Sequence, residues 1–233
     1  VKFTNKKGFK KYVYGTSWGL STRLIGAIIM IHNDEKGLIL PPKIAPIQVI
    51  IIPIKNNKKI LTLINKIVYL LYKKKIKVIV DKNFNITPGN KFYKYDNMGV
   101  PLKIIIGEYE VNNNLVELIR RDNLSKISLK IDKNLNYKVL KILNSIQSNI
   151  YKLAKKNMKK KIFNIKNYKS FKQKNKYLSG FFKTYWKNNT ENEKKIQKET
   201  KATIRCIIKK KKPGKCFYSK KRTKYQIILG KSY

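Results

Sequence analysis

Acidic residues are scarce in this chain. Twelve Asp and Glu stand against 55 Lys and Arg, which gives a formal net charge of +43 over 233 residues. A field of this sign repels cationic partners and attracts polyanions, so nucleic acid is the first expectation and an anionic membrane surface a distant second. Only five basic residues are Arg. Lys, Asn and Ile are abundant together and share A/T-rich codons, so genome composition also explains part of the charge.

Cysteine and histidine are nearly absent. Cys206 and Cys216 cannot form a disulfide framework, and they favour a reducing compartment. His32 is the only histidine, so a catalytic triad or a metal site around it has no support. We expect His32 to cap or orient the loop after the first helix. No apolar run approaches the ~18 residues of a membrane span, and no signal-peptide pattern follows Val1.

What is present is an alternation of strand and helix patterns. Residues 1–45 predict a hairpin around a Lys-Lys-Gly turn and an apolar helix in "LSTRLIGAIIMIHND". Residues 46–131 predict strand, helix, strand, helix and then three strands, which is typical of an α/β domain with a mixed sheet. The second of those helices has Pro88 in its first turn and Gly99 beyond its end. Residues 132–168 predict a long amphipathic helix or linker, and residues 169–233 a small basic and aromatic domain.

Three collinear blocks resemble one family. The stretch "TSWGLSTRLIGAIIMIHNDEKGLILPPKIAPIQVIIIPI" resembles prolyl-tRNA synthetases of the eukaryotic/archaeal type, which are class II aminoacyl-tRNA synthetases. "TPGNKFYKYDNMGVPLKIIIG" and "LIRRD" resemble their anticodon-binding domain, and "ETKATIRCI", "GKC" and "LGKSY" their C-terminal domain. The resemblance implies an α/β chain with the end of an antiparallel class II catalytic domain (1–45), a mixed-sheet anticodon-binding domain (46–131) and a small α+β C-terminal domain (169–233).

The resemblance assigns ATP contacts near the N-terminus. The third class II signature motif ends in an Arg, which here is Arg23. A guanidinium presents a planar charged fork to phosphate oxygens and can stabilise departing pyrophosphate, so Arg23 is the expected catalytic residue. Gly19 leaves room for the nucleotide near the backbone, and Ser21 matches a position that contacts ATP. A surface Arg at a helix start is the alternative for Arg23 considered alone.

The implied reaction is ATP-dependent ligation of L-proline to its tRNA, through prolyl-adenylate. Thr16, Ser17 and Trp18 match residues beside the proline pocket. The first two signature motifs, which hold most of the ATP and Mg²⁺ contacts, fall before Val1 in the family pattern. We therefore expect a C-terminal portion that is inactive alone. A non-catalytic tRNA-binding module is the alternative, and a threonyl- or glycyl-type synthetase is a weaker one.

Anticodon contacts are implied in the second block. Proline anticodons carry two guanines, whose edges a carboxylate or a cation can read. The matching positions are Asp96, Lys103, Tyr109 and Glu110, with Lys126 as a candidate phosphate contact. Tyr109 replaces a basic family residue and Ile105 a family Glu. For a lone Asp96, a surface acid at a helix end is an equal alternative. We expect Arg120-Arg121-Asp122 to include a structural ion pair.

Many relatives hold zinc with four cysteines in the C-terminal domain. Here Lys187 and Asn192 occupy the first pair of positions and only Cys216 remains of the second, so we predict no zinc. Ser232 and Tyr233 are expected either to pack back or to form a surface tail. The resemblance further implies proline tRNA, L-proline, ATP and Mg²⁺ as ligands, a homodimer in the full-length enzyme, and a cytoplasmic location with an organelle as the alternative.

Overall fold

The computed structural model describes residues 1–231, without the side chains of Lys210 and Lys211. Contacts within the chain divide it into two units, Val1–Ile150 and Tyr151–Tyr233. The division into four segments expected from the sequence, 1–45, 46–131, 132–168 and 169–233, stays a prediction. The predicted arrangement of Ser232 and Tyr233 lies outside the described residues. No helix within residues 1–231 is both long and apolar enough to cross a membrane.

The N-terminal elements of the first unit have no buried side chain. Strands β1 (Lys2–Thr4) and β2 (Lys10–Tyr12) pair antiparallel, as the predicted hairpin requires. Helix α1 (Arg23–Ile31) follows, and His32 caps its C-terminal end by donating its backbone N–H to the carbonyl of Ile28. His32 therefore lies at the C-cap position, and the role predicted for its side chain in the following loop stays a prediction.

A short hairpin then attaches this region to the first sheet. It consists of β3 (Asn33–Asp34) and β4 (Gly37–Leu38), which pair antiparallel. Gly37 has a φ of +121°, and a Cβ there would lie 2.5 Å from the Cα of Asn97. Gly99 has a φ of +74°, and a Cβ there would lie 2.6 Å from the Cβ of Leu38. The hairpin therefore packs so closely on the end of α3 that only glycine fits at both positions.

The first unit is built on a five-stranded mixed sheet, in the order β6-β5-β7-β8-β9. Strands β5 (Val49–Pro53), β6 (Val78–Val80) and β7 (Leu102–Ile106) run parallel to one another. Strands β8 (Leu115–Arg120) and β9 (Lys126–Lys130) complete it as antiparallel neighbours. This confirms the mixed α/β sheet and all five strands predicted for residues 46–131.

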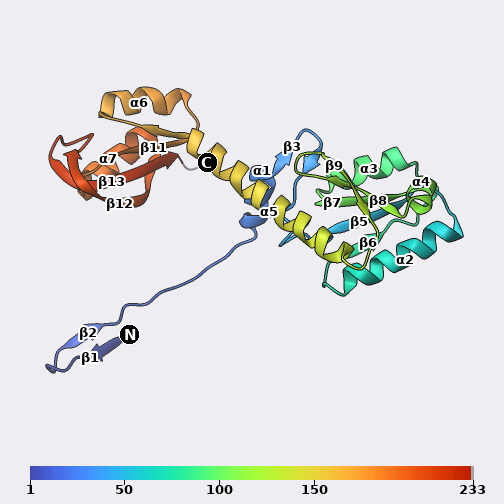
Figure 1. Ribbon diagram of the computed structural model, residues 1–233. Helices are drawn as coiled ribbons and strands as arrows, with labels where there is room; N and C mark the ends of the chain where they lie inside the picture. The colour runs from blue at the N-terminus through green and yellow to red at the C-terminus, as the bar shows by residue number, and fades with distance from the viewer. Residues whose placement is uncertain (232–233) are drawn as a thin grey trace. The chain divides into compact units, whose positions relative to one another are not determined.

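Helices α2 (Lys58–Tyr72) and α5 (Leu135–Lys160) cover one face of this sheet. Their apolar stripes meet strand residues in one continuous core, and Figure 1 shows the two helices along the sheet. α2 contributes Ile60, Ile64, Ile67 and Leu71; α5 contributes Leu135, Val139, Leu143, Ile146 and Ile150. The helix expected over 132–168 is shorter, because residues 162–164 alternate as a strand and pair with β11.

Helix α3 (Pro88–Asn97) covers part of the opposite face. Its Tyr95 packs with Ile50, Ile52 and Val100 in a second, smaller core. A buried polar cluster anchors the helix: the Tyr95 hydroxyl donates to Asp81 at 2.9 Å, and Lys91 Nζ lies 3.3 Å from the same carboxylate. Since Asp81 follows β6 directly, the cluster fixes α3 to the carboxyl end of that strand.

The second unit is a four-stranded sheet with two helices. Its strands are β10 (Ile162–Asn164), β11 (Phe181–Tyr185), β12 (Ala202–Lys215) and β13 (Arg222–Lys231), in the order β10-β11-β13-β12. Helices α6 (Tyr168–Tyr177) and α7 (Thr190–Thr200) lie between strands in the sequence. An aromatic core containing Phe171, Phe182, Trp186 and Phe217 holds this unit together.

Candidate nucleic-acid interface

Half of one sheet face in the first unit lacks a helix above it. Two rows of side chains cross it, because directly paired residues of neighbouring strands share a face. One row is Lys103, Ile119 and Lys126; the next is Ile105, Glu117 and Ser128. With strands about 4.8 Å apart, each row extends about 10 Å from β7 to β9. We call this surface, residues 103, 105, 117, 119, 126 and 128, the open face; its β7 residues are buried, its β8 residues half-buried and its β9 residues exposed.

Lys103 lies at the boundary between the open face and α3. Its side chain is only 3% exposed, and its Nζ lies 2.6 Å from Oδ1 of Asp96 at the end of α3. Burial lowers the pKa of the Lys103 ammonium, and the Asp96 carboxylate partly offsets that effect. The two residues that the resemblance assigned to guanine readout are thus brought together as an ion pair.

Arg121 fixes the position of Asp96. The Arg121 side chain is fully buried, and its Nε donates to the backbone carbonyl of Asp96 at 2.9 Å. Its two terminal nitrogens donate to both oxygens of Asp34, at 2.7 and 2.5 Å. A bidentate pair of this kind is the strongest geometry for a guanidinium and a carboxylate. Arg120 pairs with Asp122 in the same manner, which confirms the structural ion pair predicted for this triplet.

Tyr109 and Glu110 lie at the other end of β7. They belong to α4 (Glu108–Asn112), a short helix that the sequence pattern did not predict. Glu110 Oε2 accepts the backbone N–H of Gly107 at 2.8 Å, so this carboxylate caps the helix start. The Tyr109 side chain is 68% exposed. Gly107 follows Lys103 by four positions along β7, which places these groups about 13 Å from the Lys103 row.

Lys126 faces solvent beside a carboxylate that the sequence reasoning missed. Its side chain is 72% exposed, and its Nζ lies 3.3 Å from Glu117 Oε1. Glu117 was not predicted as a site residue, because strand alternation places it on one face of the sheet but does not tell which face is left without a helix. Only the register across β7, β8 and β9 brings Glu117, Ile119 and Ser128 among the predicted residues.

The predicted ATP and proline residues do not converge on a pocket within residues 1–231. Residues 15–23 are all exposed, including Thr16, Ser17, Gly19 and Ser21. Trp18 is 95% exposed, and Arg23 begins α1 with its side chain in solvent. The described residues of this region therefore do not by themselves form a site that fits ATP and Mg²⁺.

The second unit keeps one cysteine near the positions at which many relatives hold zinc. Cys216 is buried and Cys206 exposed. Burial raises the pKa of the Cys216 thiol, but hydrogen bonds from Ser219 and from the backbone of Lys187 outweigh this and leave the pKa lowered. Among the described side chains, no group of three or more His, Cys, Asp and Glu could hold a metal ion.

Comparison with known proteins identifies both units. The model of the family "Anticodon binding domain" matches residues 48–141, which contain the open face. The model of the family "Prolyl-tRNA synthetase, C-terminal" matches residues 168–233. The chain belongs to the prolyl-tRNA synthetase family. Curated prolyl-tRNA synthetases match along the whole chain: the proline–tRNA ligase of Bacteroides fragilis is 42% identical over 243 residues, and that of Amoebophilus asiaticus 40% over 239.

Solved prolyl-tRNA synthetase structures have the same fold. The enzyme of Cryptosporidium parvum complexed with L-proline and AMP superimposes with a TM-score of 0.90 at 33% identity, over all of this chain and 51% of that one. Its complex with halofuginone and AMPPNP gives 0.90 at 32% identity. This chain spans about half the length of the curated prolyl-tRNA synthetases it matches, 48% for both bacterial relatives.

Proposed function

We propose that this chain serves the ATP-dependent ligation of L-proline to its tRNA, and that its own part is to bind the anticodon of that tRNA on the open face. The relatives are proline–tRNA ligases, and the anticodon-binding family model covers the open face. The sheet surface that runs from the buried Lys103 to the exposed Lys126 carries the proposal, because splayed single-stranded bases lie on such surfaces.

The charges around the open face suit guanine. Asp96, Lys103 and Glu110 supply two carboxylates and one ammonium, which can accept from guanine N1 and N2 and donate to O6 and N7. Tyr109 offers a ring on which a base can stack, and Lys126 offers a phosphate contact. The open face consists of two rows about 7 Å apart, each about 10 Å long, and together with α4 it extends about 13 Å along β7, comparable to RNA-binding sheets that take about two or three bases.

The proposed active site, with Arg23 as the catalytic residue, rests on the resemblance of residues 16–23. Gly19, Ser21 and Arg23 would contact ATP, and Thr16, Ser17 and Trp18 would line the proline pocket. When bound, Mg²⁺ would neutralise triphosphate charge. All six residues are exposed in the described structure, so they do not by themselves enclose a substrate.

Glu110→Gln tests the anticodon assignment most sharply. Glutamine keeps an oxygen for the N–H of Gly107 but loses the charged acceptor pair that guanine needs. The preference is the ratio of the affinity for proline tRNA to the affinity for the same transcript with both anticodon guanines changed to adenine. We expect this ratio to fall about tenfold in the variant. This corresponds to on the order of 1–3 kcal/mol per base contact. Fluorescence anisotropy with the two transcripts measures it.

Glu108→Gln is the matched control. Glu108 is the neighbouring acid of α4, pairs with Lys55 at 3.1 Å, and loses the same charge. Its preference for the guanine transcript should equal that of the unchanged chain. If both variants weaken the two transcripts equally, the anticodon assignment of Glu110 is wrong.

A further inference from the structure

The second unit has an excess of positive charge, and its few acidic residues all lie in one helix. Within residues 151–233 the acids are Glu191, Glu193 and Glu199, and all three belong to α7. The strands and their connections carry lysine and arginine without acids among them. A concave site built from those strands would therefore concentrate positive potential.

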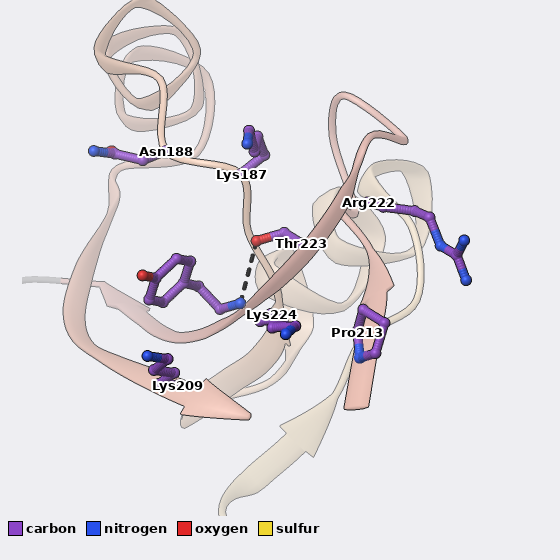
Figure 2. Close-up of a pocket in the computed structure, with 8 residues that line it drawn as sticks. Lys187, Asn188, Lys209, Pro213, Arg222, Thr223 and Lys224 are labelled. Atoms are coloured by element: carbon purple, nitrogen blue, oxygen red, sulfur yellow. Dashed lines mark hydrogen bonds between the residues drawn. The ribbon is translucent and has the colours of Figure 1, made fainter. Parts of the chain in front are cut away.

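Such a site exists beside the start of β13. A hollow of about 680 Å³ is lined by Lys187, Lys209, Arg222, Lys224, Thr223 and Tyr225 among others, with no carboxylate in its lining. Its cations come from three chain segments: the connection between β11 and α7, strand β12, and strand β13 (Figure 2). The side chain of Arg222 extends away from Thr223 (Figure 2).

The floor of this hollow is fixed by hydrogen bonds. The buried Thr223 hydroxyl donates to the carbonyl of Trp186 at 3.0 Å. It accepts the backbone N–H of Tyr225 at 3.1 Å, the dashed line in Figure 2. The N–H of Trp186 donates to the carbonyl of Tyr225 at 2.9 Å. Lys209 and Tyr225 are direct partners across β12 and β13. The backbone that carries the cations is thus held in place before any ligand arrives.

The four cations have no acidic partner within the part of the chain that the structure describes. None of Lys187, Lys209, Arg222 and Lys224 lies within ion-pair distance of a described carboxylate. Four like charges around one hollow repel one another, and a bound anion removes that repulsion. Phosphate oxygens suit both groups, because ammonium binds them as a point charge and guanidinium as a fork.

We propose that this hollow binds the phosphodiester backbone of RNA, with the ring of Tyr225 stacking on an adjacent base. Tyr225 is 47% exposed, so its ring offers a platform that a free phosphate would not use. The choice of RNA among polyanions rests on the proposed function. The site would give the second unit an RNA contact of its own, independent of the anticodon.

The test compares two fourfold variants of the full chain. The first neutralises the hollow with Lys187→Gln, Lys209→Gln, Arg222→Gln and Lys224→Gln. The second neutralises four exposed lysines of α6 and α7 with Lys169→Gln, Lys174→Gln, Lys194→Gln and Lys198→Gln, so that both lose the same net charge. Binding of a labelled single-stranded RNA is measured against salt concentration. We expect the first variant to bind RNA at least about tenfold more weakly than the second. The slope of log K against log[salt] should also become shallower by about two to three, at roughly 0.7 per phosphate contact.

A measurement without substitutions guards against misfolding. In the unchanged chain, RNA should protect Lys187, Lys209 and Lys224 from acetylation, as followed by mass spectrometry, while Lys169 and Lys194 stay reactive. Equal affinities of the two fourfold variants, or equal protection of both lysine sets, overturn the proposal. It is also overturned if the hollow variant loses only tripolyphosphate binding, or only binding to phosphatidylserine vesicles, and keeps RNA.

The outcome separates this site from the anticodon assignment. If the hollow is not an RNA site, the preference for guanine transcripts persists in the first variant. If the anticodon assignment fails instead, the hollow still contributes affinity, but equally for both transcripts.

Discussion

At the residue scale, the cluster beneath α3 links protonation to folding. Burial raises the pKa of the Tyr95 phenol to about 12, and its hydrogen bond to Asp81 and the Asp81 charge add to the shift. Burial also raises the pKa of Asp81, but hydrogen bonds from the Asn83 backbone, Tyr95 and Lys91 outweigh it and lower that pKa overall. Each group therefore stabilises the fold over a different pH range.

Tyr95→Phe should flatten the alkaline loss of stability. Since the folded state holds the phenol proton more tightly, the Tyr95 contribution is complete below pH 10, its ordinary pKa, and is lost as pH rises through about 12. In that window a single such group contributes a slope of up to about 1.4 kcal/mol per pH unit. Urea unfolding at several pH values measures the slope. Equal slopes in both proteins would show that Tyr95 does not titrate in this way.

At the residue scale, the sequence predicted the identities of the candidate site residues but not their partners. The residue types and order of Asp96, Lys103, Tyr109, Glu110 and Lys126 were readable from motifs, because motifs preserve identity and spacing. Their partners were not, since the Lys103–Asp96 ion pair depends on burial under α3. The bond from Arg121 to Asp34 joins residues 87 positions apart, which local spacing does not encode.

At the element scale, the contact between the β3–β4 hairpin and α3 depends on two glycines. Gly37 lies at a φ of +121°, where an L side chain is strained, and its Cβ position meets backbone that cannot move aside. This contact also carries Asp34, the partner of Arg121. A change that displaces the hairpin is therefore expected to break the ion pair between Asp34 and Arg121 as well.

Gly37→Ala should destabilise the first unit by about 2–3 kcal/mol, the sum of a strained φ and a backbone clash. Gly89→Ala is the control, because Gly89 lies in α3 with open space around its Cβ position. Alanine there should be neutral or stabilising by up to about 1 kcal/mol, since it favours helix. Urea midpoints compare the two. A loss from Gly37→Ala no larger than that from Gly89→Ala would contradict the close packing.

Most elements followed from periodicity, and the exceptions have physical causes. β5 and β7 are mainly apolar runs, β8 and β9 alternate with period two, and α2 and α5 have apolar stripes of period 3.6, whereas α3 was marked by Pro88 and Gly99. Helix α4 has five residues and depends on a cap from Glu110 to Gly107 rather than on an apolar stripe. Strand β10 is three residues long and is defined by its pairing with β11, which the sequence alone does not reveal.

At the scale of the whole molecule, the charge of +43 sets how the chain meets RNA. Each phosphate contact releases counterions, so the logarithm of the binding constant should fall steeply and linearly with the logarithm of salt concentration. Contacts on the open face and around β13 together predict that log K falls with log[salt] with a slope of about −4 or steeper. Titrations of proline tRNA between about 50 and 200 mM salt measure it. A nearly flat dependence would contradict RNA binding through these cations.

The placement of β9 has a consequence apart from ligand binding. This strand forms one border of its sheet, and its unpaired backbone groups could template another strand. Lys126 and Lys130 occur along it. Two molecules approaching border to border would bring these ammonium groups against their own copies, which opposes aggregation. Lys126, proposed as a phosphate contact, thus also helps to keep the sheet from extending into a second molecule.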